Sequence, residues 1–184
     1  MVPRMLCWFV GAGFSILLLA LGLSACSATP PPRWIEGGMP IALGNAHWLH
    51  HNGDVRLRAD GTVLVDGSPL FMIDRAGRVY DMYAEPVAVL LPNGRLVGTD
   101  NTDGGEVGPI SAALPGETYA WLSLRGSGRV ILYQDDGAEV RGGRWTGCKG
   151  AMLQTCTLVT HLVLLREWQR RPRAYYRVGV VIRD

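Results

Sequence analysis

The chain has 184 residues, of which 48% are hydrophobic and 18% are charged, and its formal net charge is +2. This length allows one domain or two very small ones. The apolar content excludes an intrinsically disordered protein. The small net charge gives no electrostatic case for nucleic-acid binding, so we expect no nucleic-acid partner.

The amino terminus has the pattern of an export signal. Residues 1–25 contain one charged side chain, Arg4, and the stretch from Leu6 to Leu23 is almost wholly apolar. A positive start followed by an apolar run is typical of a secretory signal peptide. The run is also nearly long enough to cross a bilayer as an uncleaved helix. We predict a signal peptide over residues 1–25.

The apolar run ends in Leu23-Ser24-Ala25-Cys26, which resembles the lipobox of bacterial lipoproteins. The resemblance covers only the first 26 residues. It implies cleavage before Cys26 and acylation of that cysteine, so that its acyl chains anchor the protein in membrane lipid. Ser27 follows, and the resemblance to the sorting rules of enteric bacteria favours the outer membrane of the cell envelope. The alternatives are an ordinary signal peptide or a membrane helix with an incidental cysteine.

Three consecutive prolines follow the cysteine, at positions 30–32. Such a run favours polyproline II, an extended and semi-rigid spacer. We therefore predict that residues 26–33 form a tether that lifts a domain off the membrane. The remainder, residues 34–184, is predicted to be a single β-rich domain.

Three histidines precede the first predicted strand, at His47, His50 and His51. Zinc needs three or four converging ligands, and these side chains are a candidate metal site. On a helix or on a strand His47 and His51 would share a face, and on a strand His50 would point the other way. No HExxH context is present. We interpret the stretch as an exposed polar segment and keep the metal site as the alternative.

From about residue 54 the chain alternates short apolar runs with glycines that stand beside Asp, Asn or another small residue. Asp-Gly and Asn-Gly between apolar runs are typical of tight hairpins. The fold class is therefore mainly β: an antiparallel meander, a sandwich or a partly open barrel of short hairpins. The predicted strands cover residues 55–58, 62–65, 78–80, 86–91, 95–97, 120–124 and 130–133.

A glycine-rich loop carries Asp100, Asp103 and Glu106. Oxygen ligands in a flexible loop suit calcium, although the spacing does not match an EF-hand. We interpret the loop as a solvated turn, with calcium as the alternative.

Two of the four cysteines are left for the exported domain, because Cys7 is lost with the signal peptide and Cys26 carries lipid. In an oxidising compartment Cys148 and Cys156 are predicted to form a disulfide. The alternative is a reactive thiol, including a nucleophilic dyad of Cys148 with His161.

Near the carboxyl end, residues 157–169 are predicted to form one amphipathic helix that Thr157 caps and Pro172 ends. A strand is the alternative, because Thr and Val favour strands. A closing strand over residues 175–182 is expected to follow. The leucines at helical spacing on one face are Leu158, Leu162 and Leu165.

The chain carries no Gly-x-Ser-x-Gly elbow, phosphate-binding loop or dinucleotide fingerprint, so we expect no cofactor. Trp34 and Trp48 are candidate ligand-binding side chains, because exposed indoles stack on sugars and anchor interfaces. Trp121 and Trp145 are expected in the core.

The expected function is that of a membrane-anchored exported lipoprotein with a non-enzymatic envelope structural or interaction domain, whose partner is an envelope protein or glycan. The alternatives are a module that binds a glycan, peptide or metal, and a cell-envelope enzyme of unrecognised motif.

Overall fold

The computed structural model describes residues 28–51 and 53–170. The predicted signal peptide, Cys26, Pro172 and the closing strand over residues 175–182 lie outside the described residues. The strands in chain order are β1 (Ala46–His50), β2 (Gly53–Leu57), β3 (Thr62–Val65), β4 (Ser68–Ile73), β5 (Arg78–Tyr80), β6 (Pro86–Leu90), β7 (Arg95–Gly98), β8 (Asp103–Val107), β9 (Ser111–Ala113), β10 (Ala120–Leu124), β11 (Arg129–Tyr133) and β12 (Glu139–Thr146). The helices are the short η1 (Thr99–Asn101) and the long α1 (Met152–Arg170).

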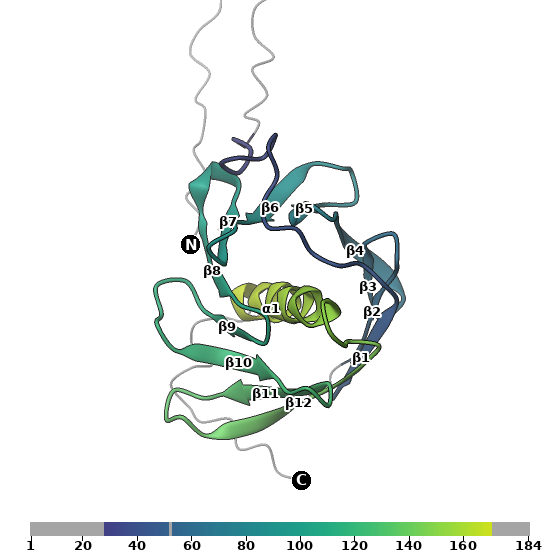
Figure 1. The fold of residues 1–184 in the computed structure, drawn as a ribbon. Helices are drawn as coiled ribbons and strands as arrows, with labels where there is room; N and C mark the ends of the chain where they lie inside the picture. Colours follow the sequence, from purple (N-terminus) through teal and green to yellow (C-terminus); the bar gives the residue numbers. More distant parts are fainter. Residues whose placement is uncertain (1–27, 52, 171–184) are drawn as a thin grey trace, which may run out of the picture.

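These strands form one closed antiparallel barrel (Figure 1). Each strand pairs with the next along the chain, and β12 pairs with β1 to close the ring, with Trp48 opposite Trp145. The prediction of a mainly β, antiparallel fold is confirmed, and the barrel is closed rather than partly open. Closure removes the unpaired edge strands that an open sheet of short hairpins would expose.

The predicted turn chemistry is present at Asn93-Gly94, between β6 and β7. Gly94 has a φ of 86°, and its N–H donates to the carbonyl of Leu91 at 2.9 Å. The Asn93 side chain accepts a hydrogen bond from the N–H of Arg95 at 3.1 Å. A side chain at position 94 would be strained at this φ, which is why glycine stands there.

Because successive strands run in opposite directions, their connections alternate between the two ends of the barrel. The entry end carries the turns that follow β2, β4, β6, β8 and β10, and α1 begins there after β12. The exit end carries the turns that follow β1, β3, β5, β7, β9 and β11, and α1 ends there.

Helix α1 runs through the ring of strands (Figure 1). A barrel of about eight strands is filled by its own side chains, whereas a wider barrel leaves a lumen. Here the helix fills it, and every side chain from Thr155 to His161 is buried. A helix that is covered on all sides has no wet face. The prediction of a helix rather than a strand over residues 157–169 is confirmed, but α1 begins earlier, at Met152, and residues 155–161 are covered on all sides instead of being amphipathic.

Hydrogen bonds attach the helix to the barrel near the entry end. The Thr155 hydroxyl donates to the carbonyl of Ala42 at 2.5 Å. The Thr157 hydroxyl lies 3.1 Å from the carbonyl of Pro109 and 2.9 Å from that of Leu153, one turn earlier in the helix. Thr157 therefore lies inside α1, where its hydroxyl bonds to carbonyls of the helix and of the turn between β8 and β9, and it is not the predicted cap.

The predicted disulfide joins Cys148 and Cys156, whose Cα atoms are 6.3 Å apart. Cys148 follows β12 and Cys156 lies in α1, so the bond fastens the first turns of the helix to the barrel wall. Both sulfurs are buried. This disulfide prediction is confirmed.

The segment before β1 contacts the barrel rather than standing clear of it. Thr29 and Asp100 exchange hydrogen bonds at the exit end: the Thr29 N–H donates to the Asp100 carboxylate and the Asp100 N–H to the Thr29 carbonyl, both at 2.9 Å. Pro31 is buried. The segment then reaches the entry end, where the Met39 N–H donates to the carbonyl of Leu90 at 2.6 Å. From Thr29 onward the predicted tether is therefore packed on the barrel.

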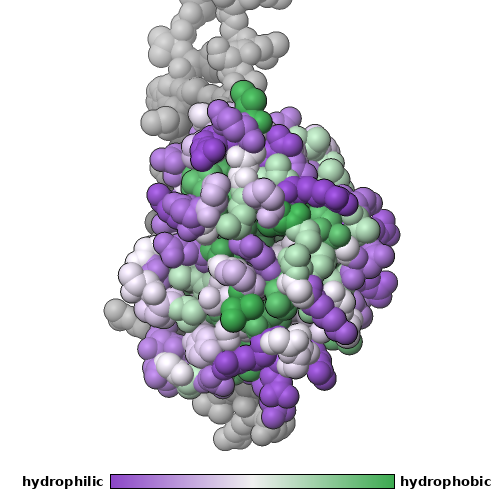
Figure 2. Space-filling model, viewed as in Figure 1, coloured by the Kyte–Doolittle hydropathy of each residue, from purple (hydrophilic) through white to green (hydrophobic). Residues whose placement is uncertain are grey.

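Figure 2 shows that the face drawn in Figure 1 is mostly hydrophilic along its outline, with apolar side chains gathered nearer the middle. Among the described residues, no helix combines the length and the apolar composition needed to cross a bilayer.

Candidate functional site

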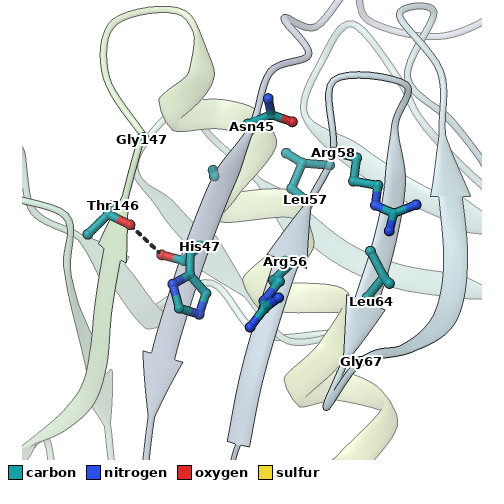
Figure 3. A pocket seen from close by; sticks show the side chains of 10 residues that line it. Asn45, His47, Arg56, Leu57, Arg58, Leu64, Gly67, Thr146 and Gly147 are labelled. Carbon is teal, nitrogen blue, oxygen red and sulfur yellow. Dashed lines mark hydrogen bonds between the residues drawn. The ribbon is translucent and has the colours of Figure 1, made fainter.

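An open groove of about 560 Å³ lies on the outer wall of the barrel, over β1, β2 and β3 and beside the end of β12 (Figure 3). Its lining residues are Asn45, Ala46, His47, Arg56, Leu57, Arg58, Leu64, Gly67, Thr146 and Gly147.

Strand alternation places three basic side chains along this groove. In β2 and just after it, Val55 and Leu57 are buried and face the core, so Arg56 and Arg58 face outward. His47 of β1 lies directly opposite Arg56 in the strand register. Figure 3 shows the His47 and Arg56 side chains on neighbouring strands, with Arg58 farther along the groove.

Asp54 orients two of these side chains. Its carboxylate accepts a hydrogen bond from Nε of Arg56 at 3.0 Å, lies 2.9 Å from Nη2 of the same residue, and pairs with Nε2 of His47. Partial burial alone would raise the pKa of Asp54, but the bonds from Arg56 and His47 outweigh it and hold that pKa below its usual value. Asp54 is therefore charged at neutral pH and balances part of the positive charge.

Arg58 has no such partner, because within residues 28–51 and 53–170 no carboxylate lies within ion-pair distance of its guanidinium. It is exposed at the entry end. A guanidinium presents several donors in a planar fork that matches carboxylate and phosphate groups. The groove is thus suited to an anionic ligand at its Arg58 side.

The three histidines of the predicted metal site do not converge. His47 faces outward, whereas His50 faces inward and stacks on Trp48 with a centroid distance of 4.4 Å. His51 is exposed in the following turn. Across the part of the chain that the structure describes, no group of three His, Cys, Asp or Glu side chains is placed to hold a metal ion. The residues form a strand and a turn, and alternation along that strand separates them.

His50 is partly buried at the exit end, and its Nε2 has no hydrogen-bond partner among the described residues. Burial lowers the pKa of His50, and this effect outweighs the attraction of the Glu167 carboxylate. His50 is therefore neutral at pH 7.

The acidic loop does not form a calcium site either. The Asp100 carboxylate accepts the N–H of Thr29 at 2.9 Å, and that of Asp103 accepts the N–H of Gly105 at 3.0 Å. Glu106 lies on β8, opposite Arg95 in the register. The first two carboxylates hold the backbone in place, and the third belongs to a strand.

Neither candidate tryptophan is an open stacking platform. Trp48 is fully buried, and its indole N–H donates to the carbonyl of Gly142 at 2.8 Å. Trp34 is half-buried and meets the ring of Tyr80 edge-on, at a centroid distance of 4.8 Å. The guanidinium of Arg78 lies 5.9 Å from the Trp34 ring. Trp48 is therefore closed to a ligand, whereas Trp34 keeps part of its surface exposed beside Tyr80 and Arg78.

The proposed dyad of Cys148 and His161 is not formed, because Cys148 is bonded to Cys156. His161 is fully buried, and burial lowers its pKa. Both of its ring nitrogens have partners inside the barrel: the indole N–H of Trp121 at 2.9 Å and the carbonyl of Gly104 at 2.7 Å. Its role here is to join the helix to the wall.

The sequence contains part of the signal for the groove. The alternation in Val55-Arg56-Leu57-Arg58 already puts two arginines on one face of a strand. The sequence does not place His47 beside them, because the polar histidines around Trp48 hide the strand pattern of β1.

Comparison of this chain with protein families, with curated proteins and with solved structures finds no match.

Proposed function

We propose that the protein is an exported lipoprotein, acylated at Cys26 and anchored to the outer membrane, whose barrel is a non-enzymatic interaction module of the cell envelope. The observation that carries the proposal is the filled lumen. Because α1 occupies the interior and its side chains from Thr155 to His161 are all buried, the barrel offers its partners its outer wall and its two ends. Such a molecule suits binding at its surface rather than enclosure of a small substrate.

The disulfide supports export. Disulfides form and persist in oxidising compartments and are rare in the cytosol. Cys148 and Cys156 are paired in the core, at a place where the bond fastens the central helix.

The amino-terminal segment suggests how the barrel would sit on the membrane. Thr29 is bound to Asp100 at the exit end, and it is three residues from Cys26. Three extended residues span at most about 11 Å. An acylated Cys26 would therefore hold the exit end beside the bilayer and leave the entry end facing away from it.

The test is metabolic labelling of the full chain with a palmitate analogue in a bacterial host. We expect label on the wild-type protein, no label on the Cys26→Ser variant, and full label on the matched control Cys7→Ser, which alters the other cysteine of the amino-terminal region. Fractionation of the envelope is expected to recover the wild-type protein with the outer membrane. Unlabelled wild-type protein, or label that persists after Cys26→Ser, would refute the anchor.

A further inference from the structure

Charge is segregated between the two ends of the barrel. Arginines lie in or beside the entry-end turns, and we call the following exposed set the basic rim: Arg58, Arg75, Arg95, Arg125, Arg129 and Arg144. The exit-end turns carry most of the acids, among them Asp66, Asp81, Asp100, Glu117, Asp135 and Asp136, whereas the entry-end turns carry Asp60 and Asp74. The net charge of +2 hides this separation.

The turns themselves do not require this arrangement. The turn between β10 and β11 depends on Gly128, which has a φ of 81°, and on the bond from its N–H to the carbonyl of Arg125 at 2.8 Å. That bond uses only the backbone of Arg125. Aspartates also serve as turn residues at the entry end, where Asp60 accepts the N–H of Thr62 at 2.9 Å. Turn chemistry therefore explains the glycines and some aspartates, and leaves the concentration of arginine unexplained.

Few carboxylates face the basic rim: Glu106 lies directly opposite Arg95 in the register, and Asp60 lies near Arg58 and interacts with it electrostatically. Among the described residues, Arg125 is its one member with an ion pair, to Glu139 at 3.4 Å. Both side chains of that pair are more than half exposed, and exposed pairs of this kind contribute little to stability. Most of the positive charge of the rim, above all that of Arg129 and Arg144, is thus available to a partner.

Two members of the rim are placed against each other. Arg129 of β11 lies directly opposite Arg144 of β12 in the register. Like charges that face each other across strands are destabilising. The Arg144 Nε–H donates to the carbonyl of Ser127 at 3.2 Å, in the turn that precedes Arg129, so the two guanidinium groups stay on the same side of the barrel. An anion bound between them would relieve the repulsion.

We propose that the basic rim binds an anionic glycan of the cell envelope through its repeated carboxylate or phosphate groups. The inference deepens the interaction function proposed above and rests on it. The arginines are spread over several turns instead of converging in one cavity, which suits a polymer with many weak contacts. An envelope location makes a glycan the polymer to expect, and the short link to Cys26 would point the entry end away from the bilayer. Arg58 belongs to both the rim and the groove, so a bound chain has a path along the outer wall.

The experiment uses the full acylated protein in a neutral detergent. The probes are polygalacturonate for carboxylates, poly(glycerol phosphate) for phosphates, uncharged dextran as the neutral control, and duplex DNA of matched charge. We expect binding to one or both anionic glycans and none to dextran. The affinity should fall as salt rises, because each ion pair releases counterions. Comparison of polygalacturonate with poly(glycerol phosphate) shows whether carboxylate or phosphate groups are recognised.

Two matched double variants locate the surface. Arg129→Gln with Arg144→Gln removes two charges from the rim, and Arg33→Gln with Arg141→Gln removes two exposed charges elsewhere. We expect the rim variant to lose about tenfold in affinity and the control to change by less than about twofold at moderate salt. The rim variant should melt no lower than the wild type, because the opposed charges are gone.

Binding to neither glycan, or equal losses in the two double variants, would overturn the proposal. Tighter binding of duplex DNA than of either glycan would assign the rim to nucleic acid and overturn the glycan as well. These outcomes are separate from the labelling result. If Cys26 is labelled but the protein binds no glycan, only the glycan proposal is contradicted. If the protein binds glycan but carries no label, only the proposed lipid anchor is contradicted.

Discussion

The indole N–H of Trp121 donates a hydrogen bond of 2.9 Å to Nδ1 of His161, and this contact fixes the tautomer of a histidine inside the barrel. An indole nitrogen can only donate, so Nδ1 carries no proton. The proton is on Nε2, which donates to the carbonyl of Gly104 at 2.7 Å. The neutral ring thus links α1 to β10 and β8, and it has no free nitrogen for a second proton.

Acid should therefore destabilise the fold through His161. Burial lowers its pKa in the folded protein, whereas in the unfolded chain the pKa is about 6.5. As pH falls below that value, His161 becomes protonated in the unfolded chain but stays neutral in the folded protein. The free energy of unfolding therefore falls with pH until the pKa of the folded protein is reached. His50, whose pKa is also lowered by burial, acts in the same direction. Denaturant titrations between about pH 7.5 and 5.5 should show this loss.

The variant His161→Gln tests which histidine is responsible. Its amide can accept from Trp121 and donate to Gly104 without titrating, so the pH dependence should become shallower than in the wild type. The matched control is His51→Gln, since His51 is exposed, and it should keep the wild-type slope. If His161→Gln has the same slope as the wild type, the assignment to His161 is wrong.

The disulfide should contribute measurably to stability. Closing a loop of about nine residues stabilises by about 2–3 kcal/mol in the chain-entropy model, so Cys148→Ala with Cys156→Ala should lower the free energy of unfolding by that amount. A reductant should bring the wild type to the level of the double variant and leave the variant itself unchanged. Equal denaturation midpoints for the two proteins in oxidising buffer would contradict this expectation.

The strands were the most predictable part of the fold, because their signals are local. Residues 62–65 and 120–124 coincide with β3 and β10, since β-branched or alternating runs between turn residues leave few alternatives. The stretch that forms β1 lacks this signal, because its histidines are polar and only Ala46 and Trp48 are buried apolar residues. Its place is set by pairing with β12, far along the chain.

The position of α1 and the charge separation could not be predicted in this way. A helix covered by a ring of strands needs no polar face, so its periodicity does not reveal where it lies. The separation of acids from arginines follows from which end each turn occupies, and that depends on the strand order of the closed barrel. The groove likewise joins β1 to β2 and β12, and sequence alone does not place their side chains together.

Removing the hydroxyl of Thr160 should be costly although valine has nearly the same shape. This hydroxyl accepts the indole N–H of Trp145 at 2.8 Å and donates to the carbonyl of Cys156 at 2.7 Å, all within the core. Thr160→Val leaves the indole N–H buried without an acceptor, which costs about 1–3 kcal/mol. The exposed Thr146→Val is the control and should change the free energy of unfolding by less than about 0.5 kcal/mol.

A double-mutant cycle with Trp145→Phe isolates this hydrogen bond. In the Trp145→Phe background no indole N–H is left without an acceptor when the Thr160 hydroxyl is removed. Thr160→Val should therefore lower the free energy of unfolding by less in that background than in the wild type. Strictly additive losses would show that the two side chains act independently and that the bond contributes nothing.

Gly38 should tolerate no side chain, because the segment before β1 lies against the entry end at this point. A Cβ there would lie 2.0 Å from the carbonyl oxygen of Leu90 and 2.7 Å from Cγ2 of Val89. The backbone cannot move away freely, since the Gly38 N–H donates to the carbonyl of Ala76 at 2.7 Å. Gly38→Ala is therefore expected to lower the free energy of unfolding by about 1–3 kcal/mol. Gly126→Ala is the matched control, because a Cβ at that position meets nothing within 4 Å. A Gly38→Ala protein as stable as Gly126→Ala would mean that the segment does not pack on the barrel as described, and the short connection from Thr29 to Cys26 would then no longer set how the barrel faces the membrane.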